Sequence, residues 1–295
     1  MKAAINLAAM VALCVAGADV ICGSPPVPGY TFHPVDSPAE LGGFASVYGL
    51  NNAGVLVGNF LTVDGDLDGF VFRNGEFIDV AVPGVTSDDR GALNEVNDHG
   101  QAVGAFTDGD TGILHSFILN RHGEFSMLPD VPDAVLTEAT GINNAGEIVG
   151  FYRDASFTPH GFILRRGVFT PYDYPGGSRT LLARINDRGQ IIGIRLDPDG
   201  HRRSFVLQNG LTTTIDVPGS RNTRVGGINN RGEIVGYYDD AEMVSHGFLF
   251  RNGAYTTLDF PGASDTALLD INDSGVISGT YDGFSHGLVA IPGKQ

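Results

Sequence analysis

Three features of the sequence predict an all-β fold, a six-bladed β-propeller with four strands in each blade. First, one pattern occurs six times, and the apolar residues that open its Asn-containing turn are Leu50, Val96, Ile142, Ile185, Ile228 and Ile271. Second, successive copies are 46, 46, 43, 43 and 43 residues apart, and a period of about 40–45 residues with four short apolar runs is typical of a propeller blade. Third, the N-terminal end of the repeat region matches a fourth strand and the C-terminal end matches a third strand, so the two ends can complete one blade together.

The fifth copy shows how one repeat is expected to fold. Its predicted strands are residues 223–229, 233–238, 246–251 and 254–260. The turn Asn252-Gly253 between the last two is a strong hairpin signal, because both residues must adopt positive φ. Pro261-Gly262 ends the fourth strand and starts the crossing to the next blade.

The ends of the chain set the domain boundaries. Residues 30–36 match a fourth strand and residues 286–290 match a third, so the N-terminal strand can complete the last blade and remove both open edges. We therefore expect a propeller over residues 30–293. Residues 1–18 are typical of a signal peptide, with 19–29 as a short linker, and a leader retained as an anchor is the alternative.

Composition limits the partners and the compartment. The net charge is −16 and no cluster of Lys and Arg occurs, which disfavours nucleic acid and anionic lipid as partners. Of two cysteines, only Cys22 follows the leader, so disulfides do not stabilise the fold. We expect a monomer without membrane insertion of the mature chain, in an extracellular or periplasmic location.

A structural clamp is predicted between the third and fourth strands of five blades. The hairpin register places a His or Arg of the third strand opposite an Asp of the fourth, where the two side chains interact directly. The pairs are His115–Asp130, His160–Asp173, Arg203–Asp216, His246–Asp259 and, between the chain ends, His286–Asp36. The first blade departs from this pattern with Asp68 opposite Ala81. If the Asp partners raise the pKa of these histidines, stability should fall as pH rises.

The repeat motifs resemble a known bacterial group. Ile228-Asn229-Asn230-Arg231-Gly232-Glu233-Ile234-Val235-Gly236 and the tripeptides His160-Gly161-Phe162 and His246-Gly247-Phe248 are similar to those of the "probable extracellular repeat, HAF family". The resemblance spans residues 30–293 and implies a secreted or surface-exposed repeat protein. It implies no catalytic residue.

Charged residues precede the Asn turn in every second blade. The six positions are Gly49, Glu95, Gly141, Arg184, Gly227 and Asp270. If the first strand of each blade is innermost, the three charged side chains lie near the central axis. They either close a narrow channel as an acid–base–acid cluster, pack into a neighbouring blade, or bind a polar ligand or ion.

A loop in the first blade resembles a calcium-binding loop. Asp64, Asp66 and Asp68 occur at alternate positions and are followed by Gly69, and Ca²⁺ prefers several oxygen ligands at about 2.3–2.6 Å. An ordinary solvated acidic loop is the alternative. No other cofactor is expected.

The function predicted from these features is non-catalytic. Motifs for a nucleophile elbow, a zinc protease, a phosphate loop and dinucleotide binding are absent, which disfavours an enzyme. We expect a secreted binding module for an extracellular glycan or protein, and a glycan lyase or hydrolase acting at the axis through Glu95, Arg184 and Asp270 is the alternative. A purely structural role at the cell surface is the third possibility. The expected contact surface is the face that carries the loops before the His-Gly-Phe motifs and the crossings after Pro83, Pro132, Pro175, Pro218 and Pro261.

Overall fold

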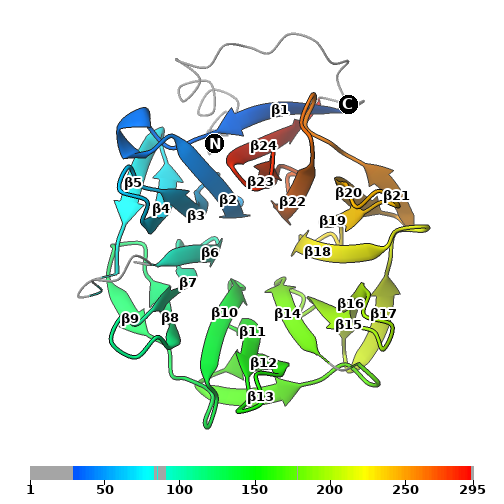
Figure 1. Cartoon of the computed structure of the whole chain (residues 1–295), viewed down its shortest axis with the longest axis horizontal. Helices are drawn as coiled ribbons and strands as arrows, with labels where there is room; N and C mark the ends of the chain where they lie inside the picture. Colours follow the sequence, from blue (N-terminus) through cyan, green and yellow to red (C-terminus); the bar gives the residue numbers. More distant parts are fainter. Residues whose placement is uncertain (1–28, 83–84, 86–90, 178, 294–295) are drawn as a thin grey trace, which may run out of the picture.

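The structure, a computed structural model, confirms the predicted six-bladed β-propeller. It describes residues 29–82, 85, 91–177 and 179–293, so the predicted leader, most of the linker and Pro83 lie outside the described residues. Six antiparallel sheets of four strands surround a central axis (Figure 1). The strands are β1 Tyr30–Val35, β2 Phe44–Leu50, β3 Leu56–Leu61, β4 Leu67–Arg73, β5 Glu76–Val80, β6 Ala92–Val96, β7 Ala102–Thr107, β8 Leu114–Leu119, β9 Phe125–Met127, β10 Leu136–Ile142, β11 Ile148–Arg153, β12 Pro159–Arg165, β13 Val168–Tyr172, β14 Thr180–Ile185, β15 Ile191–Leu196, β16 Arg202–Gln208, β17 Leu211–Ile215, β18 Asn222–Ile228, β19 Ile234–Asp239, β20 Ser245–Arg251, β21 Ala254–Thr257, β22 Thr266–Ile271, β23 Ile277–Tyr281 and β24 His286–Pro292.

The ring closes as the sequence predicts. Blade 1 consists of β2–β5, blade 2 of β6–β9, blade 3 of β10–β13, blade 4 of β14–β17 and blade 5 of β18–β21. Blade 6 takes β22, β23 and β24 from the C-terminal end and β1 from the N-terminal end. Strand β1 pairs antiparallel with β24 from Tyr30 opposite Pro292 to Val35 opposite Gly287, so both ends of the repeat region are held in one sheet.

Two details of the hairpins differ from the prediction. The fourth strand of blade 5 ends at Thr257 rather than at residue 260, although the Leu258 N–H still donates to Gly247 O. The β8–β9 hairpin has a five-residue turn instead of the two residues His122-Gly123, because Asn120 Oδ1 accepts hydrogen bonds from the N–H groups of His122 and Glu124. Its register therefore differs by one residue from the predicted one, with Ile118 opposite Ser126.

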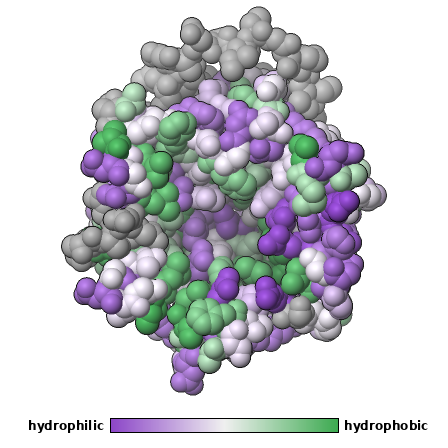
Figure 2. Space-filling model, in the orientation of Figure 1, coloured by the Kyte–Doolittle hydropathy of each residue, from purple (hydrophilic) through white to green (hydrophobic). Residues whose placement is uncertain are grey.

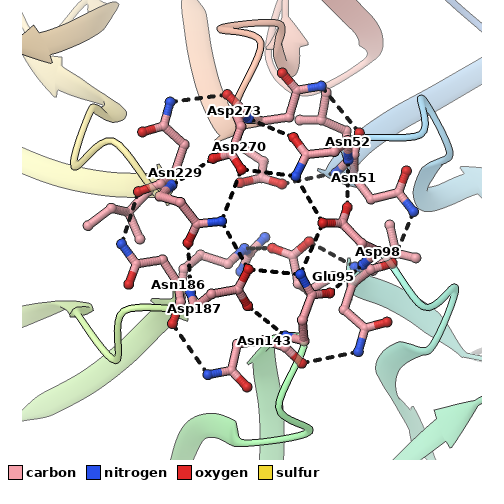
Figure 3. Close-up of a pocket in the computed structure, with 18 of the residues that line it drawn as sticks. Asn51, Asn52, Glu95, Asp98, Asn143, Asn186, Asp187, Asn229, Asp270 and Asp273 are labelled. Atoms are coloured by element: carbon pink, nitrogen blue, oxygen red, sulfur yellow. Dashed lines mark hydrogen bonds and ion pairs between the residues drawn. The ribbon is translucent and has the colours of Figure 1, made fainter. Parts of the chain in front are cut away.

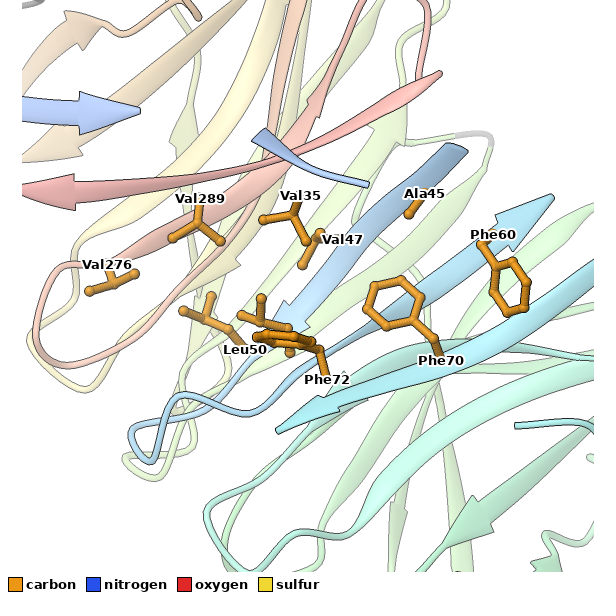
Figure 4. Close-up of a cluster of buried hydrophobic side chains, with 10 residues drawn as sticks. Val35, Ala45, Val47, Leu50, Phe60, Phe70, Phe72, Val276 and Val289 are labelled. Atoms are coloured by element: carbon orange, nitrogen blue, oxygen red, sulfur yellow. The ribbon is translucent and has the colours of Figure 1, made fainter. Parts of the chain in front are cut away.

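The core consists of six clusters of apolar side chains, each between two adjacent blades. Figure 4 shows the cluster at the closure, where Val35 and Val289 of blade 6 pack beside Val47, Phe70 and Phe72 of blade 1. Five blades bury the Phe of the third-strand motif completely, namely Phe70, Phe117, Phe162, Phe205 and Phe248. Because the ring of blades is closed, each blade buries both of its faces against neighbours.

Close packing explains why glycine ends the Ile-Val-Gly motif. Gly150 lies opposite Phe162 in the β11–β12 pair. A Cβ atom at Gly150 would lie 2.0 Å from Glu138 O and 2.8 Å from Phe162 Cζ, which is shorter than van der Waals contact. The Ile-Val-Gly and His-Gly-Phe motifs therefore depend on each other. The buried Phe ring of the second motif occupies the space that a side chain in place of the glycine of the first would need.

The alternating strand directions give the propeller two distinct faces. We call the face with the first-to-second and third-to-fourth strand turns the turn face. The opposite face, with the second-to-third strand loops and the crossings between blades, is the loop face. Within the described residues, no helix is long and apolar enough to cross a membrane.

Candidate functional site: the propeller axis and the loop face

A β-bulge in every first strand directs side chains toward the axis. The register shifts occur between Val47 and Gly49 in blade 1, and at the matching positions of the five other blades. A bulge bends the strand locally and changes the direction of the following side chain. The residue after each bulge is the one that alternates between glycine and a charged residue.

The structure brings Glu95, Arg184 and Asp270 together at the axis. Arg184 Nε lies 2.5 Å from Glu95 Oε2, and the Leu50 N–H donates to Asp270 Oδ2 at 2.9 Å. All three residues are buried, with 5–9% of their surface exposed. The prediction of an axial acid–base–acid cluster therefore agrees with the observed contacts.

Arg184 connects four blades. Its guanidinium donates to the backbone oxygens of Thr140 at 2.6 Å, Ala183 at 3.0 Å, Tyr48 at 3.0 Å and Asn94 at 2.9 Å. These oxygens belong to blades 3, 4, 1 and 2 respectively. With the Glu95 carboxylate added, the side chain uses its donors to hold the inner strands in place.

The two axial carboxyls share a low-dielectric site. Burial, followed by the charge of Asp270, raises the pKa of Glu95 well above its usual range, and Arg184 offsets only part of this increase. Burial also raises the pKa of Asp270, against the lowering effects of Arg184 and of the Leu50 N–H. Since the carboxyls are hydrogen-bonded to each other, we expect them to hold one proton between them, which leaves one negative charge to balance Arg184.

Six buried asparagines form a hydrogen-bonded ring around the axis, which the sequence analysis did not identify. In Asn143, for example, Oδ1 accepts from the N–H groups of Ala145 and Glu147 within its own turn. Its Nδ2 donates to the backbone oxygen of Asn186 in the next blade at 3.3 Å. The same inter-blade bond occurs all the way around, at 2.9–3.3 Å, from Asn51, Asn97, Asn143, Asn186, Asn229 and Asn272.

A second ring, which we call the axial Asn/Asp ring, surrounds the axis on the turn face. Its members alternate between amide and carboxylate around the six blades (Figure 3): Asn52, Asp98, Asn144, Asp187, Asn230 and Asp273. Each backbone N–H donates to Oδ1 of the next member at 2.8 Å. Each asparagine Nδ2 also donates to Oδ2 of both neighbouring aspartates, at 2.8–3.1 Å.

These rings line a small axial cavity of about 70 Å³ on the turn face, which Glu95, Arg184 and Asp270 also line. That volume has room for only a few water molecules. Partial burial acts to raise the pKa of Asp98, but the hydrogen bonds from Asn52 and Asn144 together outweigh it and hold that pKa below its usual value. At the opposite end of the axis, Figure 2 shows a hollow with hydrophilic residues in its floor and both hydrophilic and hydrophobic residues around it.

The predicted clamp pairs are in contact in all five blades. Each histidine Nδ1 lies 2.9–3.1 Å from its Asp, in the pairs His115–Asp130, His160–Asp173, His246–Asp259 and His286–Asp36. Arg203 Nη1 lies 3.3 Å from Asp216 Oδ2. The His115 contact forms despite the one-residue register difference in its hairpin.

The structure adds a third residue to three of the clamps. His160 Nε2 lies 3.5 Å from Asp154, His246 Nε2 lies 3.3 Å from Asp240, and Arg203 Nε lies 3.5 Å from Asp197. Each additional Asp is the first residue of the second-to-third strand loop. Its backbone N–H donates a hydrogen bond to a backbone oxygen near the end of the same loop. Blade 1 has Thr62 at this position, so all three clamp residues differ there together, with Asp68 in place of His and Ala81 in place of Asp.

The three aspartates of the acidic loop in blade 1 differ in exposure. Asp64 is exposed, Asp66 is half-buried and Asp68 is buried at the start of β4. Among the residues that the structure describes, no group of three or more His, Cys, Asp or Glu side chains is placed to hold a metal ion. The structure therefore does not bring the three carboxylates together, and Ca²⁺ binding by this loop stays a prediction.

The clamps predict a specific dependence of stability on pH. Partial burial lowers the pKa of His160 and of His246, but hydrogen bonds and attraction from the two Asp partners outweigh it and raise both pKa values above 6.5. Their stabilisation is therefore complete below about pH 6.5 and is lost as pH rises through the folded-state pKa values.

The measurement is the unfolding midpoint between pH 5.5 and pH 9, for the wild type and for a His160→Gln/His246→Gln variant. The buried Glu95–Asp270 pair also favours the folded state at lower pH, but it is present in both proteins. We expect a steeper decline in the wild type, and equal slopes would contradict this role of the histidines.

Apolar side chains occupy unusual backbone positions on the loop face. Phe157 and Met243 have φ of 60° and 67°, three residues before the clamp histidine of their blades. The equivalent residues in four other blades are glycines with φ of 67–90°, namely Gly65, Gly112, Gly200 and Gly283. In blade 6 the next residue, Phe284, also has a positive φ of 66°. Bulky residues rarely adopt this conformation, yet these three are 63%, 55% and 42% exposed.

Comparisons with known proteins support the fold and do not identify a family. No protein-family model matches the chain, and no curated protein matches it, so membership of the HAF group stays a prediction. Among solved structures, the chain is similar to a streptogramin B lyase, with 14% identity, a TM-score of 0.53, and coverage of 90% of this chain and 98% of the lyase.

Two further solved structures are similar to this chain. TolB from Acinetobacter baumannii is 11% identical with a TM-score of 0.58, and the match covers 81% of this chain and 64% of TolB, slightly less than two thirds of its length. A mutant of the Aleuria aurantia lectin in complex with Fucα1-6GlcNAc is 12% identical with a TM-score of 0.52, covering 84% of this chain and 94% of the lectin. At these identities the comparisons show a propeller fold alone.

Proposed function

We propose that this propeller is a non-catalytic, secreted binding module that engages an extracellular partner protein through its loop face. The observation that carries the proposal is the set of exposed apolar side chains on the second-to-third strand loops. Five blades contribute to it, with Val63, Ile113, Phe157, Met243, Val244 and Phe284.

Backbone conformation distinguishes three of these six, Phe157, Met243 and Phe284, from ordinary exposed apolar residues. Holding Phe157 and Met243 at positive φ costs roughly 1–2 kcal/mol each relative to an unstrained conformation, and glycine serves the same position elsewhere in the ring. Strained residues of this kind concentrate at binding sites. Aliphatic side chains such as Met243, Ile113 and Val63 favour contact with an apolar protein surface over contact with a glycan.

The alternative of a lyase or hydrolase at the axis has less support. Arg184 already bonds to four backbone oxygens and to Glu95, and the cavity beside it holds about 70 Å³. A substrate would have to displace structural hydrogen bonds in order to reach these groups. The similar lyase and lectin structures show that the fold accommodates either activity. The loop face is one of the places where this chain departs from its own repeat.

The test uses a Phe157→Gly/Met243→Gly variant, which removes the apolar side chains and places glycine where other blades have it. We expect its unfolding midpoint to match that of the wild type or exceed it, since the strain is relieved. Immobilised wild-type and variant proteins would be exposed to the secreted proteins of the native source, and bound proteins quantified by mass spectrometry.

A protein retained by the wild type, lost by the variant and retained by a Leu211→Ser control would support the proposal. Leu211 is 76% exposed at the start of the outer strand β17, so its substitution removes exposed apolar surface elsewhere. Equal retention by the wild type and the glycine variant would contradict the proposal. Specific binding to a glycan array that the glycine variant preserves would contradict it as well.

A further inference from the structure

A second candidate site lies between blades 1 and 2, in a cavity of about 360 Å³ that we call the blade 1–2 cleft. This volume falls within the range of small-molecule sites, about 300–1,000 Å³. Most of its lining is aliphatic or aromatic, from Val55, Val57, Val71, Val80, Leu119 and Phe125. The cleft is therefore suited to the apolar part of a small ligand.

The rim of the cleft is mainly cationic. Arg73 of blade 1 and Arg121 of blade 2 both line it, together with His122 and one acidic residue, Asp79, among the described lining residues. Arg73 Nη1 donates to Arg121 O at 3.3 Å, which holds the Arg73 guanidinium across the boundary between the blades. In a chain with a net charge of −16, two arginines beside one apolar cleft favour an anionic ligand.

Comparison of the blades shows what distinguishes this cleft. The residue before the second strand lies opposite the residue that ends the third, and in blades 3 and 5 the two form ion pairs. Glu147 lies 2.7 Å from Arg165, and Glu233 lies 2.5 Å from Arg251. Blade 4 has a hydrogen bond of 3.3 Å between Gln190 and Gln208 at the same place.

Blade 1 keeps the arginine and lacks the acid. Val55 takes the position of Glu147 and Glu233, opposite Arg73, and within the described part of the chain Arg73 forms no ion pair. The replacement has two effects at once, because it makes the wall of the cleft apolar and removes the carboxylate that pairs with the arginine in blades 3 and 5.

We propose that the blade 1–2 cleft binds a small amphipathic carboxylate. The ligand's apolar chain packs against Val55, Val71 and Phe125, and its carboxylate binds Arg73 in the way that Glu147 binds Arg165. An arginine guanidinium and a carboxylate form strong, directional hydrogen bonds. Arg73, Arg121 and His122 line this site at the turn-face hairpins, whereas the residues of the proposed protein-binding surface lie on the loop face.

Isothermal titration of the full chain with three probes of equal chain length tests the proposal. The probes are decanoate, decanol and decyltrimethylammonium, each below its micelle concentration. We expect decanoate to bind, decanol to bind at least about tenfold more weakly, and decyltrimethylammonium not to bind. Decanol binding as tightly as decanoate, or no binding of decanoate, would overturn the proposal.

Variants then locate the site. Val55→Glu rebuilds the ion pair of blades 3 and 5, so it should preserve the fold while it fills the cleft and abolishes decanoate binding. Arg73→Gln should weaken decanoate binding about tenfold and leave decanol unaffected. Arg165→Gln, which breaks the corresponding pair in blade 3, is the matched control and should bind decanoate normally. Unchanged decanoate binding by a folded Val55→Glu variant would contradict the assignment.

Discussion

Replacing Arg184 with methionine should lower the free energy of unfolding by about 3–5 kcal/mol, the usual cost of removing one partner from a buried ion pair. The substitution removes the cation that pairs with Glu95, and it removes the Arg184 hydrogen bonds to the backbone oxygens of Thr140, Tyr48 and Asn94. These oxygens lie in three different blades. We therefore expect the whole ring to lose stability, which urea unfolding followed by circular dichroism would measure.

The loss should depend on pH in a defined direction. Without Arg184, both carboxyls have still higher pKa values in the folded state, so folding requires the uptake of a second proton as pH rises. The difference between variant and wild type should therefore be larger at pH 8 than at pH 5. Arg188→Met in the exposed turn of the same blade is the control, with an expected effect within about 0.5 kcal/mol. If Arg184→Met lowered the free energy of unfolding by less than about 1 kcal/mol, Arg184 would not be needed to hold the inner strands of the four blades together.

Much of this architecture can be predicted from the sequence because it repeats. Six copies of one pattern fix the number of blades, and the complementary ends at residues 30–36 and 286–290 predict closure, which β1 and β24 confirm. Departures from the repeat predict the axial cluster, because Glu95, Arg184 and Asp270 replace glycine in alternate blades. Their proximity follows from the closed ring rather than from any local motif.

The axial Asn/Asp ring was missed for a physical reason. In the sequence, Asn52 and Asp98 each follow an asparagine and look like ordinary turn residues, because Asn and Asp both favour turns. Their hydrogen-bond partners lie 43, 46 or 221 residues away in other blades. Only the alternation of amide and acid across all six copies is visible in the sequence, and its meaning requires the residues to face one another around an axis.

Two other features escape sequence reasoning because they depend on backbone geometry. The positive φ of Phe157 and Met243 cannot be inferred from residue type. Only alignment with Gly65, Gly112 and Gly200 shows that these residues replace a glycine of the repeat. The five-residue turn at 120–124 looks like a two-residue His-Gly turn until the Asn120 side chain is seen to organise it.

Alternation around the axis also constrains the number of blades. An asparagine amide donates to carboxylates on both sides, and each carboxylate accepts from both sides, so neighbours must be of opposite type. In a ring with an odd number of blades, two amides or two carboxylates would meet. The six-bladed ring satisfies the pattern with three of each, which links the residue choice at Asn52 and its counterparts to the closure of the fold.

Breaking this alternation at one position should destabilise the protein by about 2–3 kcal/mol. Asn144→Asp replaces two amide–carboxylate bonds, to Asp98 at 3.0 Å and to Asp187 at 2.8 Å, with two contacts between carboxylates. A hydrogen bond to a charged acceptor contributes about 1.5–3 kcal/mol, and like charges add repulsion. The half-buried position of Asn144 places the expected value below the sum of two such bonds.

The control separates charge from pattern. The control is a sixfold variant that exchanges Asn and Asp at every position of the axial Asn/Asp ring. It retains the net charge and the alternation, and it changes only which blades contribute Asn and which contribute Asp. We expect this inverted ring to recover most of the stability that Asn144→Asp loses, measured as the unfolding midpoint at pH 7. Recovery in 1 M NaCl of Asn144→Asp alone would instead attribute the loss to screened charge repulsion. An inverted ring no more stable than the single variant would contradict the requirement for alternation.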